Sequence, residues 1–94
     1  MFVLALQAEL HLNDCHSLKE KRAVIRPILD GSKRRFGVSS AEVDHQDTWQ
    51  RSLLAFAIVG SSADQVTNVI DEVERFVWSH PEVAVLSMER SWIE

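Results

Sequence analysis

The sequence has a single cysteine, Cys15, and only two prolines and three glycines in 94 residues. One cysteine cannot form an internal disulfide, which excludes the small disulfide-stapled class of secreted domain. The opening residues, MFVLALQAELHL, are too few to span a bilayer, and they carry Glu9 and no basic stretch of the signal-peptide kind. We therefore expect a cytoplasmic protein with no membrane partner.

Basic residues are fewer than acidic residues. Ten Lys and Arg against fourteen Asp and Glu give a net charge of -4 and a pI near 5.5. An acidic total disfavours non-specific attachment to a phosphate backbone over the whole surface. Apolar residues at 46% and charged residues at 26% are typical of a folded globule. A chain of this length supports one core, so we predict a single domain over residues 1–94.

Hydrophobic spacing predicts four strands and two helices. Apolar residues alternate over residues 2–12, 38–45, 51–60 and 83–93, as in half-buried strands. Helical spacing over residues 18–36 and 63–79 follows two capping boxes, which begin at Ser17 and Ser62. We expect Pro27 to bend the first helix near Ala23 without breaking it, and we expect the helix to end at Gly37.

The element order is therefore βαββαβ, which predicts an α+β ferredoxin-like sandwich. We expect a four-stranded antiparallel sheet of order 4-1-3-2 with both helices on one face. The other face must then be solvated or covered by a partner.

The segments SLKEKR, Ser17 to Arg22, and AEVDHQDTWQR, Ala41 to Arg51, give the chain a family likeness. With the basic helix and the DEVERFV helix, they resemble the YlxP-like family of uncharacterised bacterial proteins over nearly the whole length. The resemblance implies a ferredoxin-like fold and no established activity. Relatives' genes often stand among translation genes, which implies a connection with RNA or the ribosome.

No pattern of catalytic residues is visible, and we expect a protein that is not an enzyme and has no cofactor. Cys15 and His16 are adjacent but have no third group to orient them. His11, His16, His45 and His80 come from four segments that the topology brings to one edge, where they could serve a metal or an anion. Without C-x-x-C or H-x-x-x-H spacing, and without glycine in NDCHS, we assign no metal site.

The open face of the sheet is the leading candidate for function. We expect Glu42 and Asp44 to point to it while Ala41 and Val43 meet the helices, and we expect Arg51 to pair with Glu9. A small apolar strip with a polar rim is typical of a partner-binding surface, most simply that of a homodimer. The residues that we assign to this partner-binding face are Val3, Ala5, Gln7, Glu9, Glu42, Asp44, Trp49, Arg51, Leu53, Ala55 and Ala57.

The alternative is an RNA- or ribosome-associated factor that contacts structured RNA through the basic helix 18–36. Seven of the ten basic residues fall between Lys19 and Arg35. The two central strands carry no exposed aromatic on which bases could stack, so contact would come from the helix. The residues that we assign to RNA or anion contact are Lys19, Lys21, Arg22, Arg26, Lys33, Arg34 and Arg35.

Overall fold

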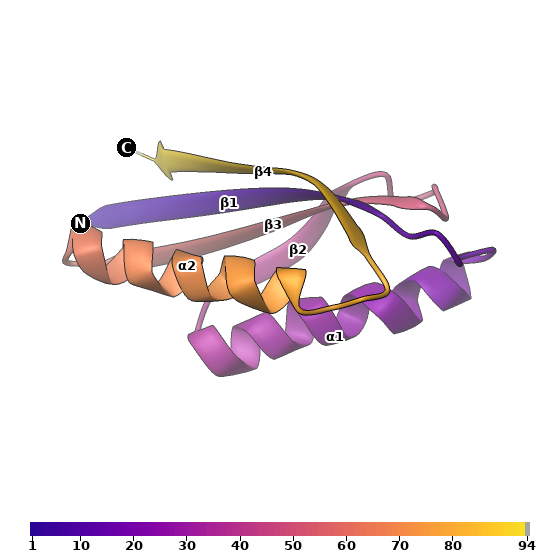
Figure 1. Cartoon of the computed structure of the whole chain (residues 1–94). Helices are drawn as coiled ribbons and strands as arrows, with labels where there is room; N and C mark the ends of the chain where they lie inside the picture. The colour runs from indigo at the N-terminus through magenta and orange to yellow at the C-terminus, as the bar shows by residue number, and fades with distance from the viewer. Residues whose placement is uncertain (94) are drawn as a thin grey trace.

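The computed structural model describes residues 1–93, so Glu94, the last residue of the predicted domain, lies outside the described residues. The elements follow in the order β1 (Phe2–His11), α1 (Leu18–Phe36), β2 (Ser39–Asp44), β3 (Arg51–Gly60), α2 (Ala63–Trp78) and β4 (Ala84–Ile93). The strands form one antiparallel sheet of order β2-β3-β1-β4. Both helices lie on the same side of it (Figure 1). The predicted ferredoxin-like architecture is confirmed.

The core lies between the sheet and the helices. The even residues of β1 and β3 point into it because the alternation of a strand puts every second side chain on the same face. Each fully buried aliphatic side chain contributes about 1.5–3 kcal/mol of apolar burial. The most deeply buried apolar residues are Leu4, Leu6, Ala8, Leu10 and Leu12 near β1, Leu54 and Phe56 of β3, Ile28 of α1, and Val66, Ile70, Val73 and Val77 of α2.

Local signals set the ends of α1. The Ser17 hydroxyl accepts a hydrogen bond from the Glu20 backbone N–H at 3.1 Å, and the Glu20 carboxylate accepts one from the His16 N–H at 2.9 Å. Gly37 ends the helix with a left-handed φ of 70°, a conformation that carries no side-chain penalty for glycine. The helix is continuous through Pro27, as predicted.

The predicted orientation of β2 is wrong for Ala41 and Glu42, and Val43, which was expected to meet the helices, is 45% exposed. Ala41 pairs with Ala55 on the open face, whereas Glu42 pairs with Leu54 and points toward the helices. A bulge between Glu42 and Asp44 then places Asp44 beside Leu53 on the open face, where it was expected. The prediction assumed that the apolar residues of this strand face inward.

Two ion pairs connect the edge strand β4 to α2. The Arg90 guanidinium donates to Asp71 at 2.7 Å and to Glu74 at 3.0 Å. The hydrogen bond to Glu74 raises the pKa of Arg90, although partial burial opposes the shift. Within residues 1–93, no helix has the length and apolar character needed to cross a membrane.

Candidate functional site

The two segments that carry the family likeness meet in space through the side chain of Lys21. This residue of α1 is only 1% exposed. Its Nζ lies 2.7 Å from Glu42 Oε2 and donates to the backbone carbonyls of His45 at 2.5 Å and Thr48 at 2.7 Å. An ammonium group has three N–H donors, and here all three have an acceptor. The expectation that Lys21 belongs to the exposed basic surface is wrong.

Lys21 is buried because of its position on the helix. It lies one and two turns before Ile25 and Ile28, on the stripe that packs against the sheet. Glu42 turns inward to meet it and also accepts a hydrogen bond from the Ser52 hydroxyl at 2.6 Å. A buried ion pair is tolerated when its polar atoms have other partners: Lys21 has its two carbonyls, and Glu42 has the Ser52 hydroxyl and a side chain that is 16% exposed to water.

His45 directly follows the last residue of β2 and has a positive φ of 64°. Its backbone N–H donates to the Asp44 carboxylate at 2.7 Å, and its Nε2 lies 3.0 Å from Glu9 Oε1. Arg51 also donates to Glu9, so the predicted pair between Arg51 and Glu9 is confirmed. Glu9 of β1 therefore contacts both Arg51 of β3 and the residue that follows β2.

Gln50 ties the loop after β1 to the loop before β3. Its side-chain Nε2 donates to the backbone carbonyl of Cys15 at 3.4 Å, and its backbone carbonyl accepts from the Leu12 N–H at 3.0 Å. The Cys15 thiol is buried here, and burial, with Glu20 and Asp14 nearby, raises its pKa. Across residues 1–93, no three His, Cys, Asp or Glu residues lie close enough together to hold a metal ion, so the histidines do not form the metal cluster considered from sequence.

Four cations form a strip along the exposed flank of α1. At about 100° per residue, Lys19, Arg22, Arg26 and Lys33 fall within about 60° of one another around the helix axis. The strip is about 21 Å long at about 1.5 Å per residue. Within residues 1–93, none of the four forms an ion pair or a side-chain hydrogen bond. We call these four residues the cationic strip.

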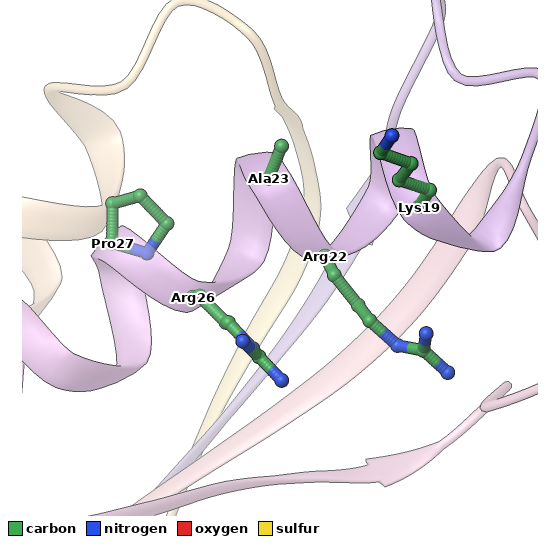
Figure 2. A pocket seen from close by; sticks show the side chains of 5 residues that line it. All are labelled: Lys19, Arg22, Ala23, Arg26 and Pro27. Atoms are coloured by element: carbon green, nitrogen blue, oxygen red, sulfur yellow. The ribbon is translucent and has the colours of Figure 1, made fainter.

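The cationic strip borders an open hollow of about 460 Å³ lined by Lys19, Arg22, Ala23, Arg26 and Pro27. Figure 2 shows the side chains of Arg22 and Arg26 extending side by side, away from the helix. The strip faces away from α2, because Gly31, about half a turn around from Arg22, is the residue that approaches Phe76 of α2.

The other basic residues of α1 differ from the strip. The guanidinium of Arg35 lies 5.0 Å from the ring centroid of Phe76 and 5.6 Å from that of Phe36. Arg35 therefore makes cation–π contacts with both rings. Arg34 is also exposed, but it lies about 100° around the helix axis from Lys33. Of the seven basic residues assigned from sequence, four therefore lie on one flank of α1, with the exposed Asp30 next to them between Arg26 and Lys33.

Charge is strongly segregated in the molecule. Helix α1 contains seven basic and two acidic residues, a net charge of +5, and the rest of the chain contains three basic and twelve acidic residues, a net charge of -9. The acidic total of -4 thus conceals a cationic helix on an acidic body. An anionic ligand is attracted to one flank of this protein and repelled elsewhere.

The open face of the sheet is apolar near its centre. Its shallow hollow of about 250 Å³ is lined by Ala5, Ser39, Ser40, Ala41, Ala55, Phe56 and Ala57. Val3 and Leu53 are half-buried, and Val59 is 60% exposed at the end of β3. Gln7 is exposed on the same face, between Ala55 of β3 and Glu89 of β4. Trp49, which was assigned to this face, instead lies in the connection between β2 and β3, and Glu42 lies on the helix side.

The inward position of Lys21 was not predicted, although the sequence contains its signal. A lysine four and seven residues before two buried isoleucines lies on the buried face of a helix. What the spacing does not reveal is its acceptor, because Glu42 lies 21 residues away in the chain and its orientation depends on the bulge.

Comparison with known proteins gives a family and a fold. Residues 3–90 match the family described as "Protein of unknown function (DUF503)". The chain is 38% identical over 86 residues to "Uncharacterized protein YlxP" of Bacillus subtilis (strain 168), covering 92% of this chain and 94% of that protein.

Two solved structures share the fold at low identity. One is described as "Structural Genomics, protein YJCS", with a TM-score of 0.61 and 9% identity over 98% of this chain and 99% of that one. The other is the de novo designed protein LFR1 1 with a ferredoxin fold, with a TM-score of 0.59 and 8% identity over 100% of this chain and 87% of that one. At this identity the likeness concerns the fold alone.

Proposed function

The chain belongs to the DUF503 family, for which no function is described, and from that starting point we propose that it is a non-catalytic binding module that contacts structured RNA through the cationic strip. The observation that carries this proposal is the presence of four exposed cations on one flank of α1, none of which forms an ion pair within residues 1–93. Fold alone does not assign this function, because ferredoxin-like domains serve many functions.

Phosphate is the ligand chemistry that best fits the strip. Its cations are spaced along about 21 Å of helix, which is long enough to follow several phosphates of one strand. Lys and Arg side chains contact phosphate oxygens without reading sequence, so this surface would recognise the shape and charge of an RNA. The acidic remainder of the protein would limit such contact to this one flank.

The test is binding of a labelled RNA hairpin, measured by fluorescence anisotropy at low salt. Replacement of Arg22 and Arg26 by Gln removes two of four contacts, and we expect a loss of affinity on the order of tenfold or more. Arg75→Gln is the matched control, since it removes an exposed arginine of α2 that pairs with Glu72. Equal affinity of the double variant and the control would refute the proposal.

A second candidate, self-association through the open sheet face, is favoured by the small-residue hollow at its centre. At about 3.3 Å per residue and 4.8 Å per strand, the sheet is about 33 Å long and 19 Å wide. The flat area of its open face is therefore roughly 600 Å², without the additional surface of the side chains. This approaches the roughly 800 Å² per partner of a standard interface. The charges of Glu9 and Arg51 already neutralise each other, which reduces the electrostatic cost of covering this face.

Sedimentation of Leu53→Glu at tens of micromolar tests this second candidate. We expect the wild type to sediment as a dimer and Leu53→Glu as a folded monomer, because the new carboxylate would be buried without a partner. Asn68→Glu, which adds the same charge on the exposed side of α2, should leave the dimer intact. A monomeric wild type would rule out self-association.

A further inference from the structure

A second hollow lies beside the N-terminus of α1 and is lined by His16, Asp47, Thr48, Trp49 and Gln50. Its volume is about 470 Å³, within the range of small-molecule sites. Trp49 is 50% exposed at its edge, so a large aromatic ring is available to a ligand. We call this hollow the Trp49 hollow.

The walls of the Trp49 hollow are held by the contacts described above. Thr48, which precedes the tryptophan, accepts from Lys21 through its carbonyl and donates its N–H to the His45 carbonyl at 3.0 Å. Gln50, which follows the tryptophan, is fixed at both its side chain and its backbone. The backbone of Trp49 is thus held on both sides, which reduces the conformational freedom that this segment loses when a ligand binds. The buried Lys21 therefore helps to preform this hollow.

The chemistry of the Trp49 hollow suits a neutral planar ligand that donates hydrogen bonds. An indole face stacks on any nucleobase. Asp47 contributes a carboxylate that accepts hydrogen bonds and repels anions, so a phosphate is disfavoured here. Guanine presents two adjacent donors, N1–H and N2–H₂, on its Watson–Crick edge, and one carboxylate can accept both. The hollow and the cationic strip thus differ in the part of a nucleic acid that each can bind.

The Trp49 hollow lies at the end of the molecule where the cationic strip begins. Lys19, the first cation of the strip, comes three residues after His16, which lines the hollow. Figure 1 shows the connection between β2 and β3 at the end of the sheet where α1 begins, and the bonds from Lys21 and Gln50 join these segments directly. An RNA that follows α1 would therefore reach Trp49 as it leaves the strip.

We infer that the Trp49 hollow binds an unpaired base of the RNA, with a preference for guanine, while the cationic strip binds the adjoining phosphates. This inference rests on the proposed function and adds the kind of RNA: one with an unpaired base next to a stem. Trp49 supplies stacking and Asp47 supplies the preference for guanine.

Three RNA hairpins with one common stem test the inference. Their loops contain unpaired guanines, unpaired uridines, or a hexaethylene glycol bridge without bases. We expect the wild type to bind the guanine loop about tenfold more tightly than the glycol-bridged stem, as stacking of one base provides. Trp49→Ala should remove this difference and Trp49→Phe should retain part of it. Asp47→Asn should lower the ratio of guanine-loop to uridine-loop affinity severalfold.

Trp78→Ala is the matched control, because Trp78 of α2 is similarly exposed and lies outside the hollow. The inference is overturned if Trp49→Ala and Trp78→Ala bind all three hairpins alike, or if the wild type does not distinguish loops from the glycol bridge. If Arg22→Gln with Arg26→Gln still weakens binding in that case, the proposed function stands without the inference. If none of the hairpins binds, both fail.

Discussion

Replacement of Lys21 by Met tests whether the buried lysine holds the two family segments together. Methionine keeps an unbranched apolar stem but removes all three donors, which leaves the carbonyls of His45 and Thr48 and the carboxylate of Glu42 without their partner. Breaking one side of a buried ion pair costs about 3–5 kcal/mol. Glu42 retains the Ser52 hydroxyl and is 16% exposed, so water can relieve part of the loss. We therefore expect a loss of about 3 kcal/mol.

A loss of this size is large for a domain of 94 residues, whose total stability is roughly 5–14 kcal/mol. It should lower the Tm by about 12–24 °C, at about 4–8 °C for each kcal/mol. Thermal and urea unfolding followed by circular dichroism measure the change. Lys19→Met, an exposed lysine of the same helix, is the control and should change stability by less than about 0.5 kcal/mol.

A double-mutant cycle separates the pair from its surroundings. Glu42→Gln alone should also destabilise, because it leaves the Lys21 charge buried without its counter-ion. The double variant should lose about 1–3 kcal/mol less than the sum of the single losses, since the two residues interact directly. The reasoning is refuted if Lys21→Met is as stable as Lys19→Met, or if the two single losses simply add.

Two further predictions concern buried positions. Cys15 is buried and should react with a thiol reagent only after unfolding. Because burial raises the pKa of this thiol in the folded state, the free energy of unfolding should decline as the pH rises above the ordinary thiol value of 9.0. Unfolding of Cys15→Ala, measured over the same pH range, should lack this decline. Gly31→Ala should lower the free energy of unfolding in urea by about 1 kcal/mol, because the new Cβ would lie 2.7 Å from the Phe76 ring. The cost of this overlap exceeds the gain in helix propensity. Equal or greater stability of the variant would contradict the close packing of Gly31 against Phe76.

The elements of the fold could be predicted from sequence because their signals are local. Alternation marks β1 and β3, and the serines at positions 17 and 62 each accept a hydrogen bond from the third residue of their helix. The order of the strands follows from the handedness of the two crossovers. None of these inferences requires knowledge of a distant partner.

The orientation of β2 could not be predicted because two long-range effects oppose its apolar pattern. Lys21 attracts Glu42 to the helix side, and the bulge that follows moves Asp44 to the other face. A pattern rule that turns apolar residues inward then gives the wrong face for Ala41 and Glu42. The residues of the strand do not themselves reveal that the facing helix carries a buried cation.

Only part of the candidate site could be predicted, and the reason is similar. The sequence shows that basic residues concentrate in α1, but it does not show which of them already have partners. Lys21 is enclosed by carbonyls and a carboxylate, and Arg35 stacks on aromatic rings, whereas Arg22 and Arg26 remain exposed. Separating a structural cation from one available to a ligand requires the tertiary structure.

The salt dependence of RNA binding tests the central claim most directly. If the four cations of the strip each contact a phosphate, the logarithm of the binding constant of the wild type for an RNA hairpin should fall with the logarithm of salt concentration with a slope of about 3. Replacement of Arg22 and Arg26 by Gln should reduce that slope to about 1.5. A wild-type slope below about 1, or no binding at low salt, would contradict the account.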